Sequence, residues 1–420
     1  MKVLHCLAQL PSHTGSGIYY SILAKGLKES GHENAFLYAV QEPFKPDMGE
    51  EALKYEIKFL SDKLNFPIAG MSDEMPYNST IYSQMSEPML DAWHNAFTTQ
   101  LMKAKAEFKP DIVLSHHLFM LTSLVKQIFS DTPVIGIAHG TDLRQIKKYP
   151  YFREKYMEDI VKLEGCIAIA PKDLSYIETI IGIDKHKVRV MGGGFNSALF
   201  YKVDCLKDKN DISLLYAGKI SASKGVYELA LAIPQIIKRL PEVLIKKLSI
   251  EIVGNADPAQ TELLNKLSGN FSGLRILPAL PQTELAEKMR KSDIFILPSY
   301  YEGLGLVNIE ALASGCLVVT TEIESLIWLL GDKINSSGVI EYVKLPRLFD
   351  ADKPYEEDKP EFINRLADKI TAQIERACKG YKADEEVYKE IAAHSWKGII
   401  AKTDKYIREL KQLKKAADLQ

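Results

Sequence analysis

The sequence predicts an α/β protein with two doubly wound, Rossmann-like domains, and three observations lead to this prediction. Short apolar runs alternate with helical patterns through most of the 420 residues. Most of these runs are continuously apolar, as parallel strands are when helices cover both faces of the sheet. The alternation breaks at Gly192–Asn196 and in the charged stretch Lys202–Asp211, and then begins again. Two domains of roughly 200 residues each fit this pattern.

Runs rich in β-branched and other apolar residues are expected to form strands. In the first half they are Val3–Leu7, Ala35–Val40, Ile112–Leu114, Val134–Ala138, Ile167–Ala170 and Val188–Met191. In the second half they are Ser213–Ala217, Ser249–Val253, Leu274–Leu277, Ile294–Leu297 and Leu317–Thr320. Segments with helical periodicity lie between the strands and at the end of the chain: Ile18–Glu29, Pro88–Glu107, Gly225–Arg239, Glu284–Lys291, Glu361–Gly380, Asp384–Ala393 and Trp396–Lys415.

We place the domain boundary where the alternation breaks. The predicted N-terminal domain covers residues 1–197, the C-terminal domain covers 198–394, and a last helical segment covers 395–420. The insert 44–82 has mixed polarity and no clean period, and segments of this kind in compact domains usually serve function. Because ligands collect at the carboxyl ends of parallel strands, we expect the two domains to face a cleft.

Composition excludes several classes of protein. The 53 Lys and Arg nearly balance the 55 Asp and Glu, whereas nucleic-acid-binding proteins usually carry a basic excess. No stretch approaches the roughly 20 apolar residues of a membrane span, and the N-terminal run lacks the long apolar core of a secretion signal. The scattered cysteines are expected to be buried free thiols in a reducing, cytoplasmic compartment: Cys6, Cys166, Cys205, Cys316 and Cys378.

The first loop with candidate chemistry is Thr14–Gly17, between the first strand and the helix expected from Ile18. Glycines let a backbone approach a ligand closely, and a helix N-terminus favours an anion. The dinucleotide fingerprint G-x-G-x-x-G is incomplete, because Tyr20 occupies the place of its last glycine. A ligand loop and a plain tight turn both fit this segment.

The second loop, Gly218–Gly225, carries Lys219 and Lys224 at the carboxyl end of a strand. Two cations beside a helix N-terminus suit a diphosphate. Two solvated surface lysines are the alternative, and spacing alone slightly favours it.

The third loop, Ser299–Gly315, is the strongest signal. A strand leads into a Gly-x-Gly loop that contains Glu302, and the helix that follows contains Glu310. A carboxylate beside free backbone N–H groups suits a phosphorylated polyol, since the carboxylate accepts from hydroxyls while the amides hold phosphate. A helix-dipole partner for Glu302 and an exposed helix position for Glu310 fit the spacing equally well.

The run from Glu302 to Gly315 resembles the Glu-x7-Glu signature of retaining nucleotide-sugar glycosyltransferases of the GT-B, family-four type. The resemblance spans nearly the whole chain except the insert. Six further segments resemble motifs of this family in the same order: Pro110–His116, His139–Asp142, Gly193–Phe200, Gly218–Gly225, Asp293–Ser299 and Ser395–Trp396.

The sequence also departs from the family pattern at several motif positions. Lys219 stands where the family usually has Arg. A planar guanidinium, which binds phosphate through two parallel hydrogen bonds, is thus replaced by an ammonium group that acts as a point charge. Leu304 replaces the usual Phe, and His116 is the only histidine left of a His-x-His pair. These departures leave open which nucleotide sugar is the donor.

The resemblance implies two Rossmann-like domains around a cleft, with the last helix crossing back to the N-terminal domain. Lys219 and Lys224 would neutralise the leaving diphosphate, Glu302 would bind the donor sugar, and Glu310 would bind the ribose. His139 would hydrogen-bond the transferred sugar. The implied donor-binding groups are Gly17, Lys219, Lys224, Gly303, Leu304, Gly305, Leu306 and Glu310, and those on the acceptor side are Gly15, Ser16 and His116.

The implied activity is transfer of a sugar from a nucleotide sugar, a UDP-sugar by preference, to an acceptor hydroxyl with retention of configuration. We expect no metal and no cofactor beyond the nucleotide-sugar co-substrate, because cationic side chains and backbone amides would stabilise the leaving group. A non-catalytic GT-B partner subunit and another GT-B enzyme, such as a phosphorylase or an epimerase, are the alternatives.

The run Tyr149–Tyr156 with Lys147 and Lys148 is basic and aromatic, like the surface of family members that act on lipid acceptors. Weak contact with the inner face of a membrane is therefore one expectation for this run. The sequence pI of about 6.5 favours the other, a solvated loop.

Overall fold

The computed structural model describes residues 1–11, 14–73, 75–203, 211–350 and 352–417. The chain divides into two compact units. Unit 1 comprises Met1–Gly193 together with Ile399–Gln420, and unit 2 comprises Gly194–Gly398. The breaks thus fall at 193/194 and 398/399, whereas the sequence places them at 197/198 and 394/395. Among the described helices, none combines the length and the apolar character that a membrane crossing requires.

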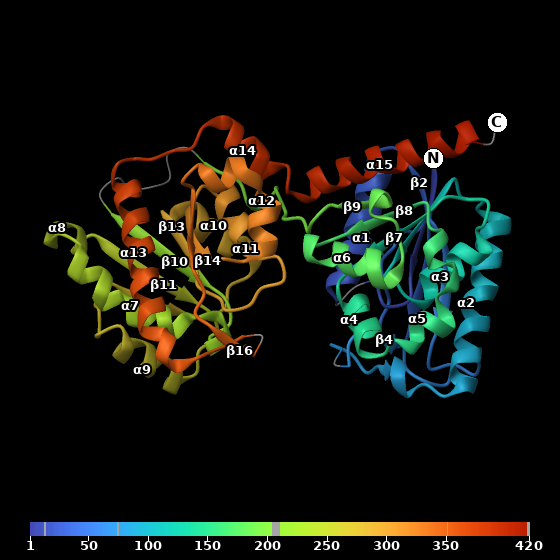
Figure 1. Ribbon diagram of the computed structural model, residues 1–420, viewed down its shortest axis with the longest axis horizontal. Coiled ribbons are helices and arrows are strands. Elements are labelled where there is room, and N and C mark those ends of the chain that lie inside the picture. The colour runs from blue at the N-terminus through green and yellow to red at the C-terminus, as the bar shows by residue number, and fades with distance from the viewer. Residues whose placement is uncertain (12–13, 74, 204–210, 351, 418–420) are drawn as a thin grey trace. The chain divides into compact units, whose positions relative to one another are not determined.

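Unit 1 is built on a parallel sheet of seven strands in the order β3-β2-β1-β6-β7-β8-β9, flanked by helices (Figure 1). Its strands are β1 Lys2–Leu7, β2 Glu33–Val40, β3 Leu53–Lys58, β6 Ile112–His116, β7 Val134–Ala138, β8 Gly165–Ala168 and β9 Val188–Val190. Its helices are α1 Gly15–Glu29, α2 Glu87–Glu107, α3 Met120–Ile128, α4 Thr141–Lys148, α5 Tyr151–Tyr156 and α6 Leu174–Tyr176. The last helix, α15 Trp396–Ala417, joins unit 1 from Ile399 onward.

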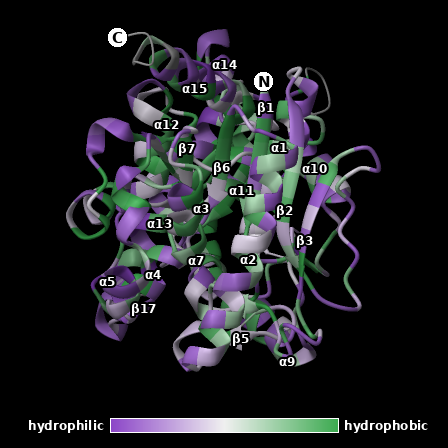
Figure 2. Cartoon of the chain, turned by 90° about the vertical axis from the view of Figure 1, so that its right-hand side faces the viewer, coloured by the Kyte–Doolittle hydropathy of each residue, from purple (hydrophilic) through white to green (hydrophobic). Residues whose placement is uncertain are grey.

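Apolar periodicity explains how the helices of unit 1 attach to its sheet. In α2 the buried residues Leu90, Trp93, Phe97 and Leu101 recur every three or four positions and form one apolar face. The inner strands are buried along almost their whole length, as in β6 and β7. Figure 2 shows these strands mostly in the green of hydrophobic residues. The six strands expected in this half are therefore confirmed.

The insert 44–82 contains a strand that the sequence did not reveal. β3 extends the sheet at its edge and pairs in parallel with β2, with Leu53 opposite Ala35. Tyr55 and Ile57 are buried, while the residues between and beside them are more exposed. An edge strand with one solvated face alternates in polarity, so a search for continuous apolar runs misses it. The insert also holds the short parallel pair β4 Ala69–Gly70 and β5 Thr80–Ile81.

Unit 2 contains a parallel sheet of six strands in the order β12-β11-β10-β13-β14-β15. The strands are β10 Ile212–Ala217, β11 Leu248–Val253, β12 Leu274–Leu277, β13 Ile294–Leu297, β14 Leu317–Thr321 and β15 Ile340–Val343. A hairpin of β16 Leu348–Asp350 and β17 Lys353–Pro354 follows. The helices are α7 Val226–Arg239, α8 Glu242–Ile245, α9 Pro258–Leu267, α10 Gln282–Lys291, α11 Leu306–Ala313, α12 Glu324–Ser336, α13 Lys359–Cys378 and α14 Glu385–Ala392.

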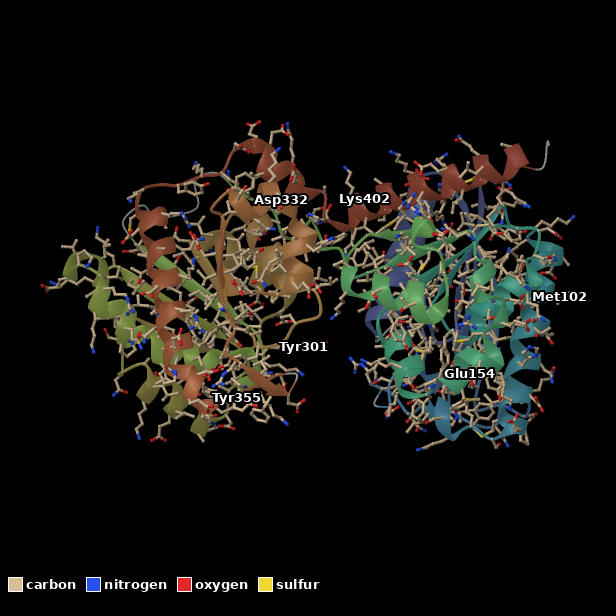
Figure 3. The ribbon with its side chains drawn as sticks, in the orientation of Figure 1. Met102, Glu154, Tyr301, Asp332, Tyr355 and Lys402 are labelled. Atoms are coloured by element: carbon tan, nitrogen blue, oxygen red, sulfur yellow. The ribbon has the colours of Figure 1, made fainter. Side chains whose placement is uncertain are left out.

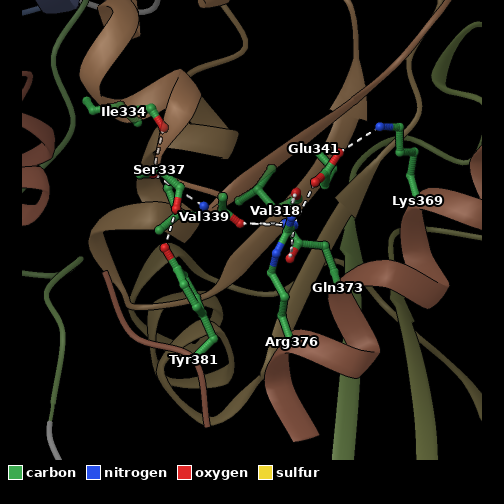
Figure 4. Close-up of polar contacts among 10 residues, drawn as sticks. Val318, Ile334, Ser337, Val339, Glu341, Lys369, Gln373, Arg376 and Tyr381 are labelled. Atoms are coloured by element: carbon green, nitrogen blue, oxygen red, sulfur yellow. Dashed lines mark hydrogen bonds and ion pairs between the residues drawn. The ribbon is translucent and has the colours of Figure 1, made fainter. Parts of the chain in front are cut away.

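The five strands expected in unit 2 are confirmed, and the edge strand β15 is additional. Polar side chains bind α13 to this edge (Figure 4). Gln373 donates to the carbonyl oxygens of Val318 and Gly338, each at 3.2 Å. The carboxylate of Glu341 on β15 accepts hydrogen bonds from Lys369 Nζ at 2.7 Å and from Arg376 Nη1 at 2.6 Å. These charged groups add to the apolar packing of α13, since Ile370 and Ile374 are buried in the same hydrophobic cluster as Ile340 and Val343 of β15.

The cysteine prediction is correct in part. Cys6, Cys166 and Cys316 are buried free thiols. Cys378 is free but exposed, because it is the last residue of α13. Cys205 lies outside the described residues.

Candidate functional site

In unit 2 the loop after β10 and the loop after β13 are held together by a close backbone approach. Gly225 has φ +64°, and a Cβ atom there would lie 2.1 Å from the carbonyl oxygen of Pro298. Only glycine fits such a position. The backbone N–H of Tyr300 donates to the carbonyl of Ser223 at 3.0 Å. Lys224, which precedes Gly225, therefore lies next to the loop that contains Glu302.

This approach forms an ion pair between two of the predicted site residues. Lys224 Nζ lies 2.7 Å from Glu302 Oε1, and both side chains are largely shielded from solvent, with 25% and 16% of their surfaces exposed. Ser299 Oγ donates to the same carboxylate oxygen at 2.9 Å. An anion that binds Lys224 would compete with Glu302, and the freed carboxylate would then accept hydrogen bonds from hydroxyls.

The other predicted cation lines a cavity. Lys219 is exposed at the mouth of a cavity of about 510 Å³ at the carboxyl ends of β10 and β11. Both apolar and polar residues line it: Ala217, Gly218, Lys219, Ile220, Ser221, Val253, Gly254, Asn255, Gln260, Ala279, Leu280, Leu285 and Val307. This size lies within the range of small-molecule sites. Lys224 is not among the lining residues, so the two lysines occupy different parts of the site.

The loop from Gly303 to Leu306 presents backbone donors. Gly305 has φ +66° and precedes the first turn of α11. The N–H groups of Gly303, Leu304, Gly305 and Leu306 find no acceptor within the described part of the chain. A helix N-terminus with free N–H groups attracts anions, so this loop is suited to a phosphate.

Glu310 lies within α11 and is partly buried, which excludes the alternative of an exposed helix position. Burial raises the pKa of its carboxyl to about 7, and a hydrogen bond with Gln282 opposes that shift. Near neutral pH the group therefore exists in both protonation states, so the carboxyl is able either to donate to a hydroxyl or to accept from one.

Asn308 is a residue that the sequence reasoning missed. Its side chain is fully buried in α11, and neither amide atom has a partner among the described residues. A Cβ atom at Gly305 would approach its Nδ2 to 3.0 Å. The sequence does contain a signal for this residue, because Asn308 is a polar residue between Val307 and Ile309 on an otherwise apolar helix face.

In unit 1 two predicted histidines meet at the carboxyl ends of β6 and β7. His116 Nδ1 lies 3.0 Å from His139 Nε2, and the rings are stacked with centroids 5.2 Å apart. Burial lowers the pKa of both imidazoles well below the usual range. The two rings are therefore neutral at physiological pH, and one donates its N–H to the other.

Asp142 positions this pair, although the sequence reasoning assigned it no role. Its carboxylate is fully buried and accepts from the backbone N–H of His139 at 3.1 Å and that of Leu118 at 2.6 Å. Burial raises the pKa of Asp142 to about 6, and these hydrogen bonds oppose the shift. His117, with φ +69°, lies 4.9 Å from His139 between ring centroids.

The loop Thr14–Gly17 differs from expectation. α1 begins at Gly15, not at Ile18, and Thr14 caps it by accepting the N–H of Gly17 at 3.0 Å. In this structure the capping hydroxyl of Thr14 occupies the Gly17 amide, and the role of that amide in donor binding stays a prediction. Gly15 is exposed, and Ser16 Oγ lies 3.2 Å from Thr14 Oγ1.

The basic run near residue 150 has partners within the protein. Lys148 pairs with Asp73, and Lys155 Nζ lies 2.5 Å from Glu87 Oε1. Arg153 Nε donates to the carbonyl of Ile181 at 3.0 Å. These cations therefore have partners within the protein, and Tyr151–Tyr156 forms helix α5 where the sequence favoured a solvated loop. Contact with a membrane stays a prediction.

The described residues contain no group of three or more His, Cys, Asp or Glu side chains placed to hold a metal ion. Metal independence nevertheless stays a prediction, since a metal can arrive with the substrate.

The exposed side chain of Tyr301, labelled in Figure 3, borders Glu302 in the signature loop.

Comparison with known proteins gives matches over most of the chain. The family described as Glycosyltransferase Family 4 matches residues 14–199, and Glycosyl transferases group 1 matches residues 200–344. A D-inositol 3-phosphate glycosyltransferase from Catenulispora acidiphila is 26% identical over 278 residues. That alignment covers 60% of this chain and 64% of the relative, which is less than two thirds of the relative's length.

Solved structures match over nearly the whole chain. A glycosyltransferase from Rickettsia africae has a TM-score of 0.62 and 16% identity, with 97% of this chain and 98% of that chain covered. An Anabaena protein in complex with UDP has a TM-score of 0.58 and 14% identity, with 97% and 100% covered. At these identities the likeness is one of fold.

Proposed function

Because the chain belongs to glycosyltransferase family 4 and has the GT-B fold, we propose that it transfers a sugar from a UDP-sugar to an acceptor hydroxyl with retention of anomeric configuration. One observation carries this proposal: Lys224 and Glu302 meet at 2.7 Å beside the free amides of the signature loop. A cation, a carboxylate and free N–H groups together match the diphosphate and hydroxyls of a nucleotide sugar.

The donor is assigned to unit 2. The cavity of about 510 Å³ receives the base, with Lys219 at its edge, and Glu310 accepts from the ribose. Lys224 and the amides of Gly305 and Leu306 hold the diphosphate, while Glu302 binds hydroxyls of the sugar. The choice of UDP is supported by the Anabaena protein of the same fold, which was crystallised with UDP.

The proposed reaction proceeds without a metal. The bond between the anomeric carbon and the phosphate oxygen breaks, and a bond to the acceptor oxygen forms on the same face of the sugar. The acceptor's proton passes to the leaving phosphate. Negative charge grows on that phosphate, and fixed cations and amides that already point at it lower the barrier.

Unit 1 is proposed to supply the acceptor side. His139, neutral and held by His116 and Asp142, hydrogen-bonds the transferred sugar near the reacting carbon. His116, Gly15 and Ser16 line the acceptor side, while Gly17 is assigned to capping. The buried free thiols and balanced charge support a cytoplasmic location.

A panel of nucleotide sugars tests the proposal. Thermal unfolding is followed with each donor, since a ligand at ~100 times its Kd stabilises by roughly 2.7 kcal/mol. We expect a UDP-sugar to raise the melting temperature and to release UDP when an acceptor is present. NMR of the product then gives the anomeric configuration. If no nucleotide sugar stabilises the protein, a non-catalytic role is favoured. Inversion of configuration would exclude the retaining mechanism.

A further inference from the structure

A second cavity, of about 320 Å³, lies in unit 1 where α4 meets the segment after β4. We call it the α4 cavity. Thr141, Arg144, Gln145 and Lys148 line it from α4, and residues 71–73 line it from the insert. None of these side chains has a role in the proposed donor site.

The base of the α4 cavity is polar. Gln145 is buried, and its Nε2 donates to the carbonyl of Met71 and to Asp73 Oδ1, each at 3.3 Å. Asp73 also pairs with Lys148. These contacts join the insert to α4 across three side chains, so the insert forms one wall of the site.

One acceptor at this base is unsatisfied. Gln145 Oε1 receives no hydrogen bond from any described residue, although the side chain is only 5% exposed. Buried side-chain oxygens without a donor are uncommon in folded proteins. A hydroxyl of a bound ligand would supply the missing donor.

The charges that line the α4 cavity leave one cation uncompensated. Lys148 and Asp73 neutralise each other, whereas the Arg144 guanidinium makes no hydrogen bond or ion pair with the described residues. Its planar fork matches the paired oxygens of a phosphate. The hydroxyl of Thr141, at the first position of α4, adds a further donor.

The α4 cavity also lies near the residue that the proposed function assigns to the sugar. Thr141 follows His139 by two positions, at the carboxyl end of β7. Ligands of parallel α/β sheets bind at this edge. A molecule in the α4 cavity would therefore lie on the same edge of the sheet as His139.

We propose that the α4 cavity binds the acceptor, and that the acceptor is a polyol carrying a phosphate. Arg144 holds the phosphate, while Gln145 Oε1 and Asp73 accept hydrogen bonds from polyol hydroxyls. The assignment of this ligand as an acceptor rests on the proposed function. The phosphate belongs either to a soluble polyol phosphate or to a lipid headgroup, and the chemistry that Arg144 recognises is the same.

Calorimetric titration of the full chain tests the proposal. The probes are myo-inositol 1-phosphate, sn-glycerol 3-phosphate and the two unphosphorylated polyols. The variants are Arg144→Ala, Arg144→Lys and the control Lys147→Ala, which removes an exposed cation from the same helix outside the cavity. We expect the wild type to bind one phosphorylated polyol at least tenfold more tightly than its unphosphorylated form. Arg144→Ala should remove that preference, Arg144→Lys should keep part of it, and Lys147→Ala should not change it.

Vesicles distinguish the two sources of the phosphate. Arg144-dependent binding to vesicles of phosphatidylinositol in phosphatidylcholine, and not to phosphatidylcholine alone, identifies a lipid headgroup. Binding of only the soluble compounds identifies a free polyol phosphate. Either result supports the proposal. Absence of binding to both at millimolar concentrations overturns it, as does an equal loss in Arg144→Ala and Lys147→Ala.

Titration of the wild type with UDP separates this inference from the proposed function, because every residue that lines the donor cavity lies in unit 2. Binding of UDP without Arg144-dependent binding of a polyol phosphate contradicts only the α4 cavity. If a polyol phosphate binds and no nucleotide sugar does, the proposed glycosyltransferase reaction is contradicted. The α4 cavity then remains a binding site for phosphorylated polyols.

Discussion

Lys224 and Glu302, 78 positions apart in the chain, form an ion pair with 2.7 Å between Nζ and Oε1. The pair joins the loop after β10 to the signature loop after β13. On the proposed function, the diphosphate of a donor would compete with the Glu302 carboxylate for Lys224. The carboxylate would then hold the lysine in place until a donor binds.

The first prediction concerns Lys224. Lys224→Ala should weaken UDP binding by roughly 1.5–3 kcal/mol, the range for a hydrogen bond to a charged group. Lys219→Arg should retain UDP affinity, since the charge at the cavity mouth is kept. Calorimetry with UDP and with uridine gives the answer, because uridine lacks the diphosphate and should bind all variants equally. Unchanged UDP affinity in Lys224→Ala would show that this lysine is only a structural partner of Glu302.

The second prediction separates the two signature glutamates. Interactions that strengthen in the transition state appear in kcat, and interactions equal in both states appear in KM. Glu302→Gln should lower kcat more than tenfold, roughly 1.4 kcal/mol or more, without weakening UDP, because it also removes the carboxylate that competes for Lys224. Glu310→Gln should mainly raise donor KM and weaken free UDP. Steady-state kinetics and UDP titrations measure both effects, and the opposite pattern would mean that the roles are exchanged.

The third prediction follows from the pKa of Glu310, which burial raises from 4.5 to about 7. The folded state then binds more protons than the unfolded state between these two values, so stability falls as the pH rises through them. Glu310→Gln cannot ionise and avoids this loss. The melting temperature of the variant relative to the wild type should therefore be higher at about pH 8 than at about pH 5. A difference that does not change with pH would show that Glu310 titrates normally.

The fourth prediction concerns metals. Turnover should survive EDTA, because on the proposed function Lys224 and the amides of the signature loop would stabilise the leaving diphosphate in place of a metal ion. Activity is measured before and after chelation, and after Mg²⁺ or Mn²⁺ is added back. Loss on chelation with recovery on either metal would refute this part of the mechanism.

The fifth prediction concerns His116 as a positioning residue. Its Nδ1 lies 3.0 Å from His139 Nε2, so His116→Ala leaves a buried ring nitrogen without a partner, which costs roughly 1–3 kcal/mol. We expect kcat to fall while UDP affinity stays constant, and His116→Asn to recover part of the loss. The exposed His94 on α2 provides a control, since His94→Ala removes an imidazole without touching the pair. Equal kcat in both alanine variants would assign the pair to packing alone.

Much of the fold was predictable because buried parallel strands have a strong local signature. All eleven expected strands are present, and the helices differ by a few residues at their ends. In the two large sheets the missed strands are β3 and β15, and both lie at sheet edges, where one face meets solvent or charged side chains such as Glu341. Whether a short mixed segment becomes an edge strand depends on the neighbour with which it pairs, and that information is not local.

The residues of the candidate site also fall into two groups, those that the sequence indicated and those that it did not. The order of motifs along the chain sufficed to single out Lys224, Glu302, Glu310 and His139, because each stands in a short strand–loop–helix segment whose geometry is local. Asp142 and Asn308 were not found, since their importance arises from complete burial and from hydrogen bonds made or left unmade. The capping bond from the Gly17 amide to Thr14 was not foreseen either, because it depends on where α1 begins.

The sequence by itself determined that this is a family 4 glycosyltransferase with two parallel α/β sheets and a signature loop, because these features depend on neighbouring residues. Only the tertiary structure decided that Lys224 pairs with Glu302 while Lys219 borders a separate cavity, and that the pKa of Glu310 lies near 7. It also decided that the insert forms a wall of the α4 cavity with Arg144 left uncompensated. Ion pairing and desolvation depend on distances between groups far apart in the chain, and folding alone sets those distances.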